Sequence, residues 1–560
     1  MIRKILIKIE SVEMSLSQWI YGFMGILFVR FIFELLSSPA RKNTILFNPI
    51  TLVHYGLFWI TLTLGLIIIV GFFSKNYLST SKIALFGLPI IWLAPIFDII
   101  ISRGNGYTQS YIFDNGYKLI FDFFTFFGSN LKWGATYGIR IEMLIVLIGV
   151  GWYLRKSEIR WIKTFAGIFS VYILGFIMAS WPGILYTISH INAEIGTLPD
   201  IFNPNGTLPQ IYNFFGQAVF QSTISHNTLY EGMSSVSTSR FFELGFDKLS
   251  SQILFIVSCF LTNLLFWKID KKKFIAVIKN IRLERIGSYL ALLLCGMGFA
   301  YINGLSSHFV WSDIFGVVCL FISWISLWMY AVHENDIADV AIDEISNKER
   351  PLIKRDLAKK EMQETGYIWL VIAILGAFCA GFYPFFMSLV YIFSSHIYSS
   401  PPLRLRRFPL IPSFLIGVAS LATILAGFFF ISVDKNPETF PIILAVGIVV
   451  MVTLAINVKD MKDIEGDRVN GIMTLPVIFE KNGPKVVGLC FALSFLLFPF
   501  FLSFYFLYII SIPAAIIGYR LVIKKPYSEK PIFILRFTFL LCVGIVYIGI
   551  LWLVNTMLLQ

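Results

Sequence analysis

The chain has 560 residues, of which 57% are hydrophobic and only 14% are charged, and its formal net charge is +12. Soluble domains carry about 25% charged residues, so this composition excludes an ordinary soluble protein and is typical of a polytopic membrane protein. The positive charge is therefore interpreted as a bias between the two sides of a membrane, and no nucleic-acid partner is expected.

The N-terminal half contains about six apolar stretches long enough to cross a bilayer. We expect the first of these to be retained rather than cleaved as a signal peptide, because Arg30 and Glu34 interrupt it and no small-residue cleavage site follows. Their i, i+4 spacing predicts an internal ion pair. The predicted spans are about 17–36, 51–73, 82–103, 136–154, 161–181 and 250–268.

A polar segment near 190–249 contains few basic residues and is predicted to be a long outer loop. A strongly basic linker follows at about 268–286, which indicates the cytoplasmic side and a domain boundary. We therefore predict two domains. Residues 1–270 form a multi-helix membrane domain whose function and protein partners are unknown, and residues 271–560 form a second membrane domain.

The C-terminal half is predicted to cross the membrane about nine more times. Counting spans from the basic linker places the loops rich in Lys and Arg on one side of the membrane, where the positive-inside rule expects them. The sequence thus predicts an all-α, polytopic integral membrane protein. The nine spans lie near 287–305, 311–333, 366–382, 384–399, 409–431, 438–458, 484–501, 503–522 and 533–556.

Two aspartate-rich segments follow apolar spans and fall on the same predicted side. On a helix, Asn335, Asp339 and Asp343 would share one face, and Asp463 and Asp467 repeat the i, i+4 spacing. Like charges at this spacing repel, so the pattern indicates a cation between them, and oxygen ligands favour Mg²⁺. The alternative is that these aspartates are ordinary solvent-exposed residues in loops at the helix ends. The candidate metal ligands are Asn335, Asp336, Asp339, Asp343, Asp460, Asp463 and Asp467.

Basic residues surround both segments, as a bound diphosphate would require. Any single one of them can equally be a topology anchor. Pro401 and Pro402 prevent helix continuation, so they place the following arginines on a loop that can fold back over the site. The candidate diphosphate ligands are Lys348, Arg350, Arg406, Arg407, Lys462 and Arg468, with Arg282 and Arg285 of the linker as further candidates.

These residues resemble the UbiA-type intramembrane prenyltransferases over roughly 271–560. The family is marked by an NDxxDxxxD segment followed by Arg-Pro, here Asn335–Asp343 with Arg350-Pro351, and by a second Asp-rich segment, here Asp460–Asp467. The Tyr-Ser-x-Pro-Pro-Leu-x-Leu pattern at Tyr398 also resembles a family loop, which adds Tyr398 to the diphosphate ligands. The resemblance implies nine helices around a central cavity and Mg²⁺ held by both segments. By the same resemblance, Asp339, Asp343, Asp463 and Asp467 are the catalytic residues.

The implied reaction is Mg²⁺-dependent transfer of a prenyl group from a prenyl diphosphate, through an allylic cation, to a lipid-soluble or aromatic acceptor. The motifs look closer to members that prenylate homogentisate, chlorophyllide or isoprenoid glycerol phosphate than to the 4-hydroxybenzoate branch. Two alternatives stay open, an intramembrane terpene cyclase and a lipid-diphosphate carrier. The expected location is a prokaryotic plasma membrane, with the site on the cytoplasmic side and in contact with membrane lipids.

Two histidines near the motifs, His333 and His396, are candidate bases, although a histidine at such a position is more often a polar residue at a helix end. The six cysteines are dispersed through apolar runs, so we expect packing roles rather than disulfides or a zinc site.

Overall fold

A computed structural model describes residues 2–37, 48–189, 238–306, 309 and 311–558. Most of the predicted outer loop near 190–249 therefore lies outside the described residues. The chain divides into two compact units. Unit 1 comprises residues 1–224, 232–271 and 310–315, and unit 2 comprises 225–231, 272–309 and 316–560.

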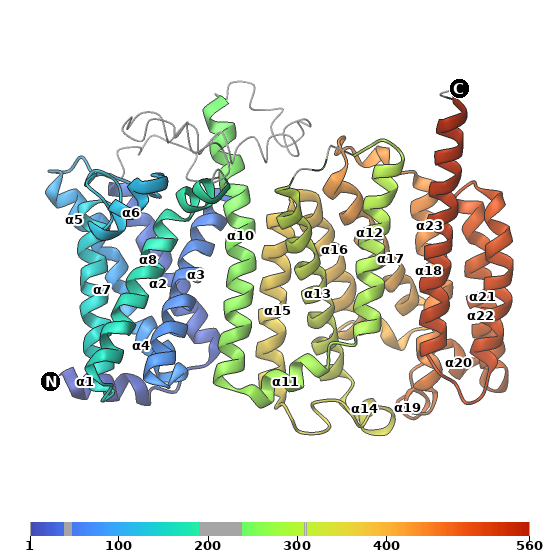
Figure 1. The fold of residues 1–560 in the computed structure, drawn as a ribbon. Helices are drawn as coiled ribbons and strands as arrows, with labels where there is room; N and C mark the ends of the chain where they lie inside the picture. Colours follow the sequence, from blue (N-terminus) through green and yellow to red (C-terminus); the bar gives the residue numbers. More distant parts are fainter. Residues whose placement is uncertain (1, 38–47, 190–237, 307–308, 310, 559–560) are drawn as a thin grey trace. The chain divides into compact units, whose positions relative to one another are not determined.

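The described part of unit 1 is built mainly of helices (Figure 1), with one short parallel strand pair, β1 and β2. Its elements are α1 (Ile2–Ser11), α2 (Leu16–Ser37), α3 (Pro49–Ser74), α4 (Tyr77–Gly87), η2 (Leu88–Trp92), α5 (Leu93–Ile101), β1 (Thr108–Gln109), α6 (Gly116–Phe124), β2 (Trp133–Gly134), α7 (Tyr137–Lys156), α8 (Trp161–Ser189) and α10 (Thr238–Ile269).

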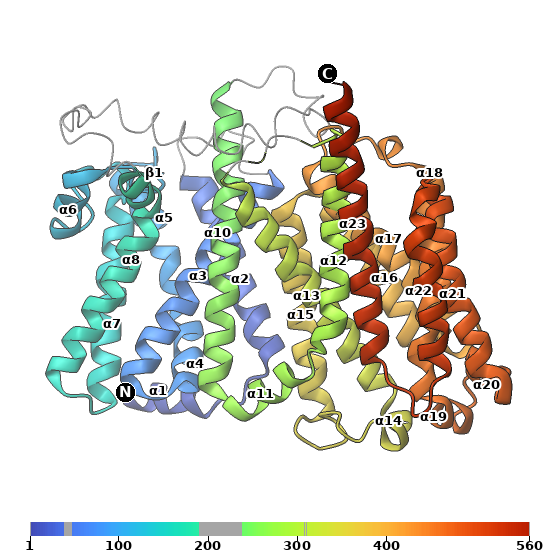
Figure 2. The same cartoon turned by 45° about the vertical axis from the view of Figure 1, so that its right-hand side comes forward.

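Unit 2 is a bundle of long antiparallel helices joined at one end by short helices (Figures 1 and 2). Its elements are α11 (Lys271–Lys279), α12 (Leu283–Ile302), α13 (Asp313–Ala338), α14 (Val340–Ser346), α15 (Lys359–Ala380), α16 (Phe382–Ser399), η3 (Leu405–Arg407), α17 (Ile411–Ile431), η4 (Pro437–Thr439), α18 (Ile442–Ala455), η5 (Ile456–Lys462), α19 (Ile464–Val469), α20 (Leu475–Ile478), η6 (Glu480–Asn482), α21 (Gly483–Phe501), η7 (Tyr505–Leu507), α22 (Tyr508–Ile523) and α23 (Lys530–Leu558).

The predicted all-α membrane fold is confirmed, because helices form at all the predicted spans and 13 helical stretches in the described residues are long and apolar enough to cross a membrane. The two remaining predicted spans are α16 and α23. Large apolar side chains such as Ile442 and Leu489 are 75% and 61% exposed on the helix surfaces. A lipid environment accounts for such exposure, which would be costly in water.

The buried Arg30 of unit 1 is paired with two carboxylates. Arg30 on α2 lies 3.5 Å from Glu34, as its spacing predicted, and 3.1 Å from Glu142 on α7. Its guanidinium also donates to Gln109 at 2.5 Å and to the carbonyl of Ile91. This network joins α2 and α7 to the segments between them, so Arg30 has a structural role that needs no ligand.

Close helix packing shapes the bundle of unit 2. A Cβ added to Gly296 on α12 would lie 2.0 Å from the carbonyl oxygen of Ile424, and one added to Gly427 on α17 would lie 2.1 Å from that of Leu293. Only glycine allows the two backbones to approach so closely. Because α12 also contacts α23, the first and last long helices of the unit lie side by side.

Candidate active site

A cavity of about 460 Å³ opens inside unit 2. It is walled by residues of α12, α13, α16, α17, α18, α21 and α23. Most of the wall is apolar or aromatic, including Tyr289, whose ring lies 5.6 Å from that of Trp328 and 5.4 Å from that of Tyr391. One end is strongly charged, because both aspartate segments contribute to it. This volume is within the usual range for small-molecule sites, roughly 300–1,000 Å³.

The first aspartate segment does not lie on one continuous helix, and in this the sequence prediction was wrong. Helix α13 ends at Ala338, and Asp339 is the N-cap residue of the short helix α14 with φ −106° and ψ 17°. The backbone N–H of Asp339 still donates to the Asn335 carbonyl, and that of Asp343 donates to the Asp339 carbonyl, both at 2.9 Å. The three side chains therefore stay close although the helix direction changes.

The second segment repeats this construction. The 3₁₀ helix η5 ends at Lys462, and Asp463 is the N-cap residue of the short helix α19 with φ −102° and ψ 7°. The N–H of Asp467 donates to the Asp463 carbonyl at 2.8 Å. In each segment one aspartate occupies a break between two helices, a position where short polar side chains are favoured.

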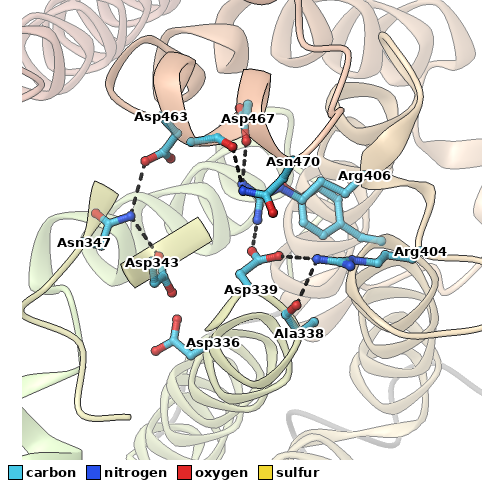
Figure 3. A network of polar contacts seen from close by, with 12 residues as sticks. Asp336, Ala338, Asp339, Asp343, Asn347, Arg404, Arg406, Asp463, Asp467 and Asn470 are labelled. Carbon is cyan, nitrogen blue, oxygen red and sulfur yellow. Dashed lines mark hydrogen bonds and ion pairs between the residues drawn. The ribbon is translucent and has the colours of Figure 1, made fainter. Parts of the chain in front are cut away.

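Two side chains join the segments (Figure 3). The Asn347 amide nitrogen donates to Asp343 at 2.8 Å and to Asp463 at 3.3 Å. The guanidinium of Arg406 pairs with Asp339 and lies 3.4 Å from Asp467. Carboxylates from segments more than 100 residues apart therefore surround one small space.

The predicted oxygen ligands separate into two groups. Those that line the cavity are Asn335, Asp339, Asp343, Asp460 and Asp463. Asp467 is fully buried behind Arg406, and its other oxygen accepts from Thr474 at 3.5 Å.

Asp336 lies near Asp343, but it does not line the cavity (Figure 3). It lies 2.8 Å from Arg282 and 3.5 Å from Arg350, and it accepts from Asn280 at 2.8 Å. Its oxygens are engaged by these donors, so this geometry argues against Asp336 as a direct metal ligand.

The predicted diphosphate ligands also separate. Arg350, Tyr398, Arg406 and Lys462 line the cavity. By contrast, Lys348, Arg407 and Arg468 are exposed and do not line it. Each of these three residues lies on a surface turn or short helix. A neighbouring residue faces the inside of the unit, so the cation faces outwards. Arg406 and Arg407, adjacent in sequence, show the contrast most clearly.

Among the polar cavity-lining residues that sequence reasoning missed, Asn347 and Glu529 contact the aspartate segments or the cations beside them. Asn347 follows the first segment, and its amide gave no signal beside so many charged neighbours. Glu529 precedes α23 and lies 3.3 Å from Arg285 and 3.7 Å from Lys462. Neither residue belongs to a recognisable motif, so only the fold brings them to the site.

Burial makes the carboxyls hard to ionise. It raises the pKa of Asp343 to about 7, and the nearby carboxylate of Asp336 raises it further. Burial likewise raises the pKa of Asp467 to about 6, while Arg406 acts in the opposite direction. A bound cation would reverse this effect by stabilising the charged forms.

The donor set fits Mg²⁺ that is shared with a substrate. Among the described residues, no three Asp, Glu, His or Cys side chains converge to form a complete site. Mg²⁺ in phosphate-handling sites usually takes only one or two carboxylates and completes its shell with water and phosphate oxygens. The second carboxylate oxygen of Asp343 is buried without a hydrogen bond, so an acceptor atom remains available for such an ion.

Neither histidine lines the cavity. His333 contacts the Met329 carbonyl at 2.7 Å within α13, and His396 lies 2.9 Å from Glu334. Both are polar residues near helix ends rather than bases at the site. The cysteines are free, as predicted.

Comparison with known proteins gives a partial match. Residues 289–543 match the UbiA prenyltransferase family. The chain is 25% identical over 208 residues to the digeranylgeranylglyceryl phosphate synthase of Sulfolobus acidocaldarius, which covers 36% of this chain and 72% of that protein. It is 29% identical over 158 residues to the probable homogentisate phytyltransferase 2, chloroplastic, of Oryza sativa subsp. japonica, covering 26% of this chain and 40% of that protein.

Among solved structures, a UbiA homolog from Archaeoglobus fulgidus bound to GPP and Mg²⁺ aligns with 49% of this chain and 99% of its own length. The sequence identity is 15% and the TM-score is 0.39.

Proposed function

Because the C-terminal half of the chain, residues 289–543, belongs to the UbiA prenyltransferase family, we propose that this membrane protein transfers a prenyl group from a prenyl diphosphate to a membrane-associated acceptor. The observation that carries the proposal is the joining of two aspartate segments by Asn347 and Arg406 at the charged end of an apolar cavity. We assign this activity to residues 271–560.

In this proposal, Asn335, Asp339 and Asp343 would hold the cofactor Mg²⁺ from one side and Asp460 and Asp463 from the other, while Asp467, buried behind Arg406, would position that arginine. When bound, Mg²⁺ would supply positive charge that stabilises the diphosphate leaving group. The ordering of the carboxylates before substrate arrives reduces the reorganisation that the reaction requires.

The basic residues of the cavity contribute the complementary charge. Arg350, Arg406 and Lys462 are placed to donate hydrogen bonds to diphosphate oxygens, and the Tyr398 hydroxyl, which accepts from Lys459 at 2.7 Å, lies beside them. As the allylic C–O bond breaks, the electron pair leaves with the diphosphate, so these donors stabilise the charge that develops there.

The apolar part of the cavity accommodates the prenyl chain and keeps water from the cation. Rings such as Tyr289, Trp328 and Tyr391 can present their faces to positive charge. The acceptor then forms a bond with the allylic carbon, and the proton that it loses is taken by the departing diphosphate. The exclusion of water favours transfer over hydrolysis.

The acceptor is proposed to be an aromatic quinone-type or chlorophyll-type precursor or an isoprenoid glycerol phosphate. The similarity to synthases of digeranylgeranylglyceryl phosphate and to a homogentisate phytyltransferase supports this range. We place the site on the cytoplasmic side, because the basic helix α11 and the Lys524–Lys525 pair lie in loops that the positive-inside rule assigns to that side.

The test is diphosphate release by the purified protein in lipid nanodiscs, with Mg²⁺ and prenyl diphosphates of several lengths. Each reaction is run with and without an extract of the source membrane that supplies acceptors. Asp463→Asn removes one proposed ligand charge. Asp356→Asn, an equivalent change at an exposed loop carboxylate outside the cavity, is the matched control.

Release that requires the extract and Asp463 supports a transferase, and mass spectrometry of the product identifies the acceptor. Release without acceptor, accompanied by a hydrocarbon product, would instead indicate a cyclase. Donor binding without any release, with donor crossing the bilayer of vesicles, would indicate a carrier and overturn the proposal.

A further inference from the structure

Among the described residues, one cation in the cavity wall has no carboxylate partner. Seven basic residues line the cavity. They are Arg282, Arg285, Arg350, Arg406, Lys459, Lys462 and Arg536. The first six each lie within 4 Å of an Asp or Glu oxygen. In the part of the chain that the structure describes, no Asp or Glu oxygen lies within 4 Å of Arg536, and Glu529, the carboxylate that acts on its charge, is paired with Arg285 and Lys462.

Arg536 lies outside the ion pairs that the aspartate segments form. It lies six residues into α23 from Lys530, a rise of about 9 Å along the helix. One of its terminal nitrogens donates to the carbonyl of Ala455, the last residue of α18, at 2.5 Å. Its guanidinium also lies 5.1 Å from the ring centre of Phe491 on α21. The cation thus lies on the wall formed by α18, α21 and α23.

These contacts do not satisfy the guanidinium. A side chain of this type has five N–H donors in a planar fork, whereas the described residues provide one hydrogen-bond acceptor. An arginine that only closed the end of α18 could do so from the lipid or water side. Arg536 instead lines an apolar cavity, where an uncompensated charge is unfavourable unless a ligand supplies an anion.

The diphosphate is not that anion, because the two aspartate segments and their own arginines already define its proposed place. We propose that Arg536 binds an acidic group of the acceptor, a phosphate or a carboxylate, and that the acceptor class is therefore an anionic lipid or aromatic acid. This assignment rests on the proposed function for the donor side of the cavity. With its acid at Arg536, the acceptor would present its other end towards the donor's allylic carbon.

The first experiment measures acceptor binding without donor or Mg²⁺. The full chain is placed in phosphatidylcholine nanodiscs, and binding is followed by fluorescence of tryptophan, since Trp328 lines the cavity. The probes are a prenylglycerol phosphate and homogentisate, each compared with a neutral counterpart, the prenylglycerol and hydroquinone. The variants are Arg536→Gln and Arg536→Lys. Arg520→Gln, at an exposed position on α22 outside the cavity, is the control.

We expect at least one acid to bind the wild type more tightly than its neutral counterpart, and the identity of that acid distinguishes phosphate from carboxylate. Arg536→Gln should weaken binding of the acid roughly 10-fold or more and leave the neutral compound unchanged, because a charge-assisted pair is lost. Arg536→Lys should restore part of the preference. The same split should appear in turnover, as a higher KM for the acid with the KM for prenyl diphosphate unchanged.

Equal binding of acids and neutral compounds by the wild type would overturn the inference. So would equal weakening of both classes in Arg536→Gln, or a loss of thermal stability in that variant with the acid preference intact, since either result assigns Arg536 to structure alone. Failure of the proposed function is a separate outcome, because absence of diphosphate release in the wild type does not affect the binding measurement.

Discussion

Replacing Arg406 with Gln should damage the site, whereas replacing the adjacent Arg407 should not. Arg406 is 9% exposed and pairs with Asp339 and Asp467, one carboxylate from each segment. Arg407 is exposed, does not line the cavity and has no ion pair among the described residues. The sequence predicted that both residues bind the diphosphate. Comparing the two variants therefore tests a difference that only the fold reveals.

The expected loss of stability depends on the ion-pair and hydrogen-bond partners that each carboxylate retains in the variant. Removing one partner of a buried ion pair typically costs about 3–5 kcal/mol. Asp339 retains Arg404 at 3.0 Å, and Asp467 retains Thr474 and can take up a proton because its pKa is raised to about 6. Both effects reduce the loss, so we expect Arg406→Gln to destabilise unit 2 by about 2–3 kcal/mol.

The assay is thermal unfolding in nanodiscs with and without Mg²⁺ and a prenyl diphosphate, together with the KM for that donor. Arg406→Gln should lower the unfolding temperature, and Mg²⁺ should restore part of the loss because it replaces positive charge between the segments. The donor KM should rise about 10-fold or more, as for loss of a charged hydrogen bond. Similar values for the two variants would refute the reasoning.

Three further predictions concern the joined segments. Asn347→Leu leaves Asp343 and Asp463 without their shared donor, so Mg²⁺ affinity measured by calorimetry should fall about 10-fold, and an unchanged affinity would contradict the assigned role. Metal-free stability should decrease as pH rises from about 4 to about 7, because the folded pKa values of Asp343 and Asp467, about 7 and about 6, exceed those of the unfolded chain and the folded state binds more protons. Mg²⁺ affinity should increase over the same interval, since the ion competes with the proton of Asp343, and a pH-independent affinity would exclude Asp343 as a ligand. Chelation should abolish diphosphate release and added Mg²⁺ should restore it, whereas release that persists in chelator would refute metal dependence.

Much of the fold could be predicted because membrane helices are determined by local composition. The length of the apolar stretches was enough to locate every predicted span. The uneven distribution of Lys and Arg between the loops assigned both aspartate segments to one side of the membrane. The same local signal failed at Asp339 and Asp463. Spacing predicted a continuous helix face, whereas the chain breaks at each of these residues and begins a new short helix.

The remaining differences arise from contacts between distant segments, which spacing cannot reveal. Asp336 and Asp339 look equivalent in sequence, yet Asp336 is engaged by Arg282 from the preceding linker while Asp339 lines the cavity. Asn347 gave no sequence signal and nevertheless joins the two segments. Arg536 lies near the start of the last predicted span, and only the fold shows that it belongs to the cavity wall.

The central claim is that both aspartate segments act on one diphosphate. It is tested most directly by single-turnover diphosphate release with Asp343→Asn, Asp463→Asn and the double variant. We predict that each single change lowers the rate roughly 100-fold or more and that the double variant is little worse, because residues that act as a unit are not additive. Independent, multiplicative losses, or a single variant with the wild-type rate, would contradict it.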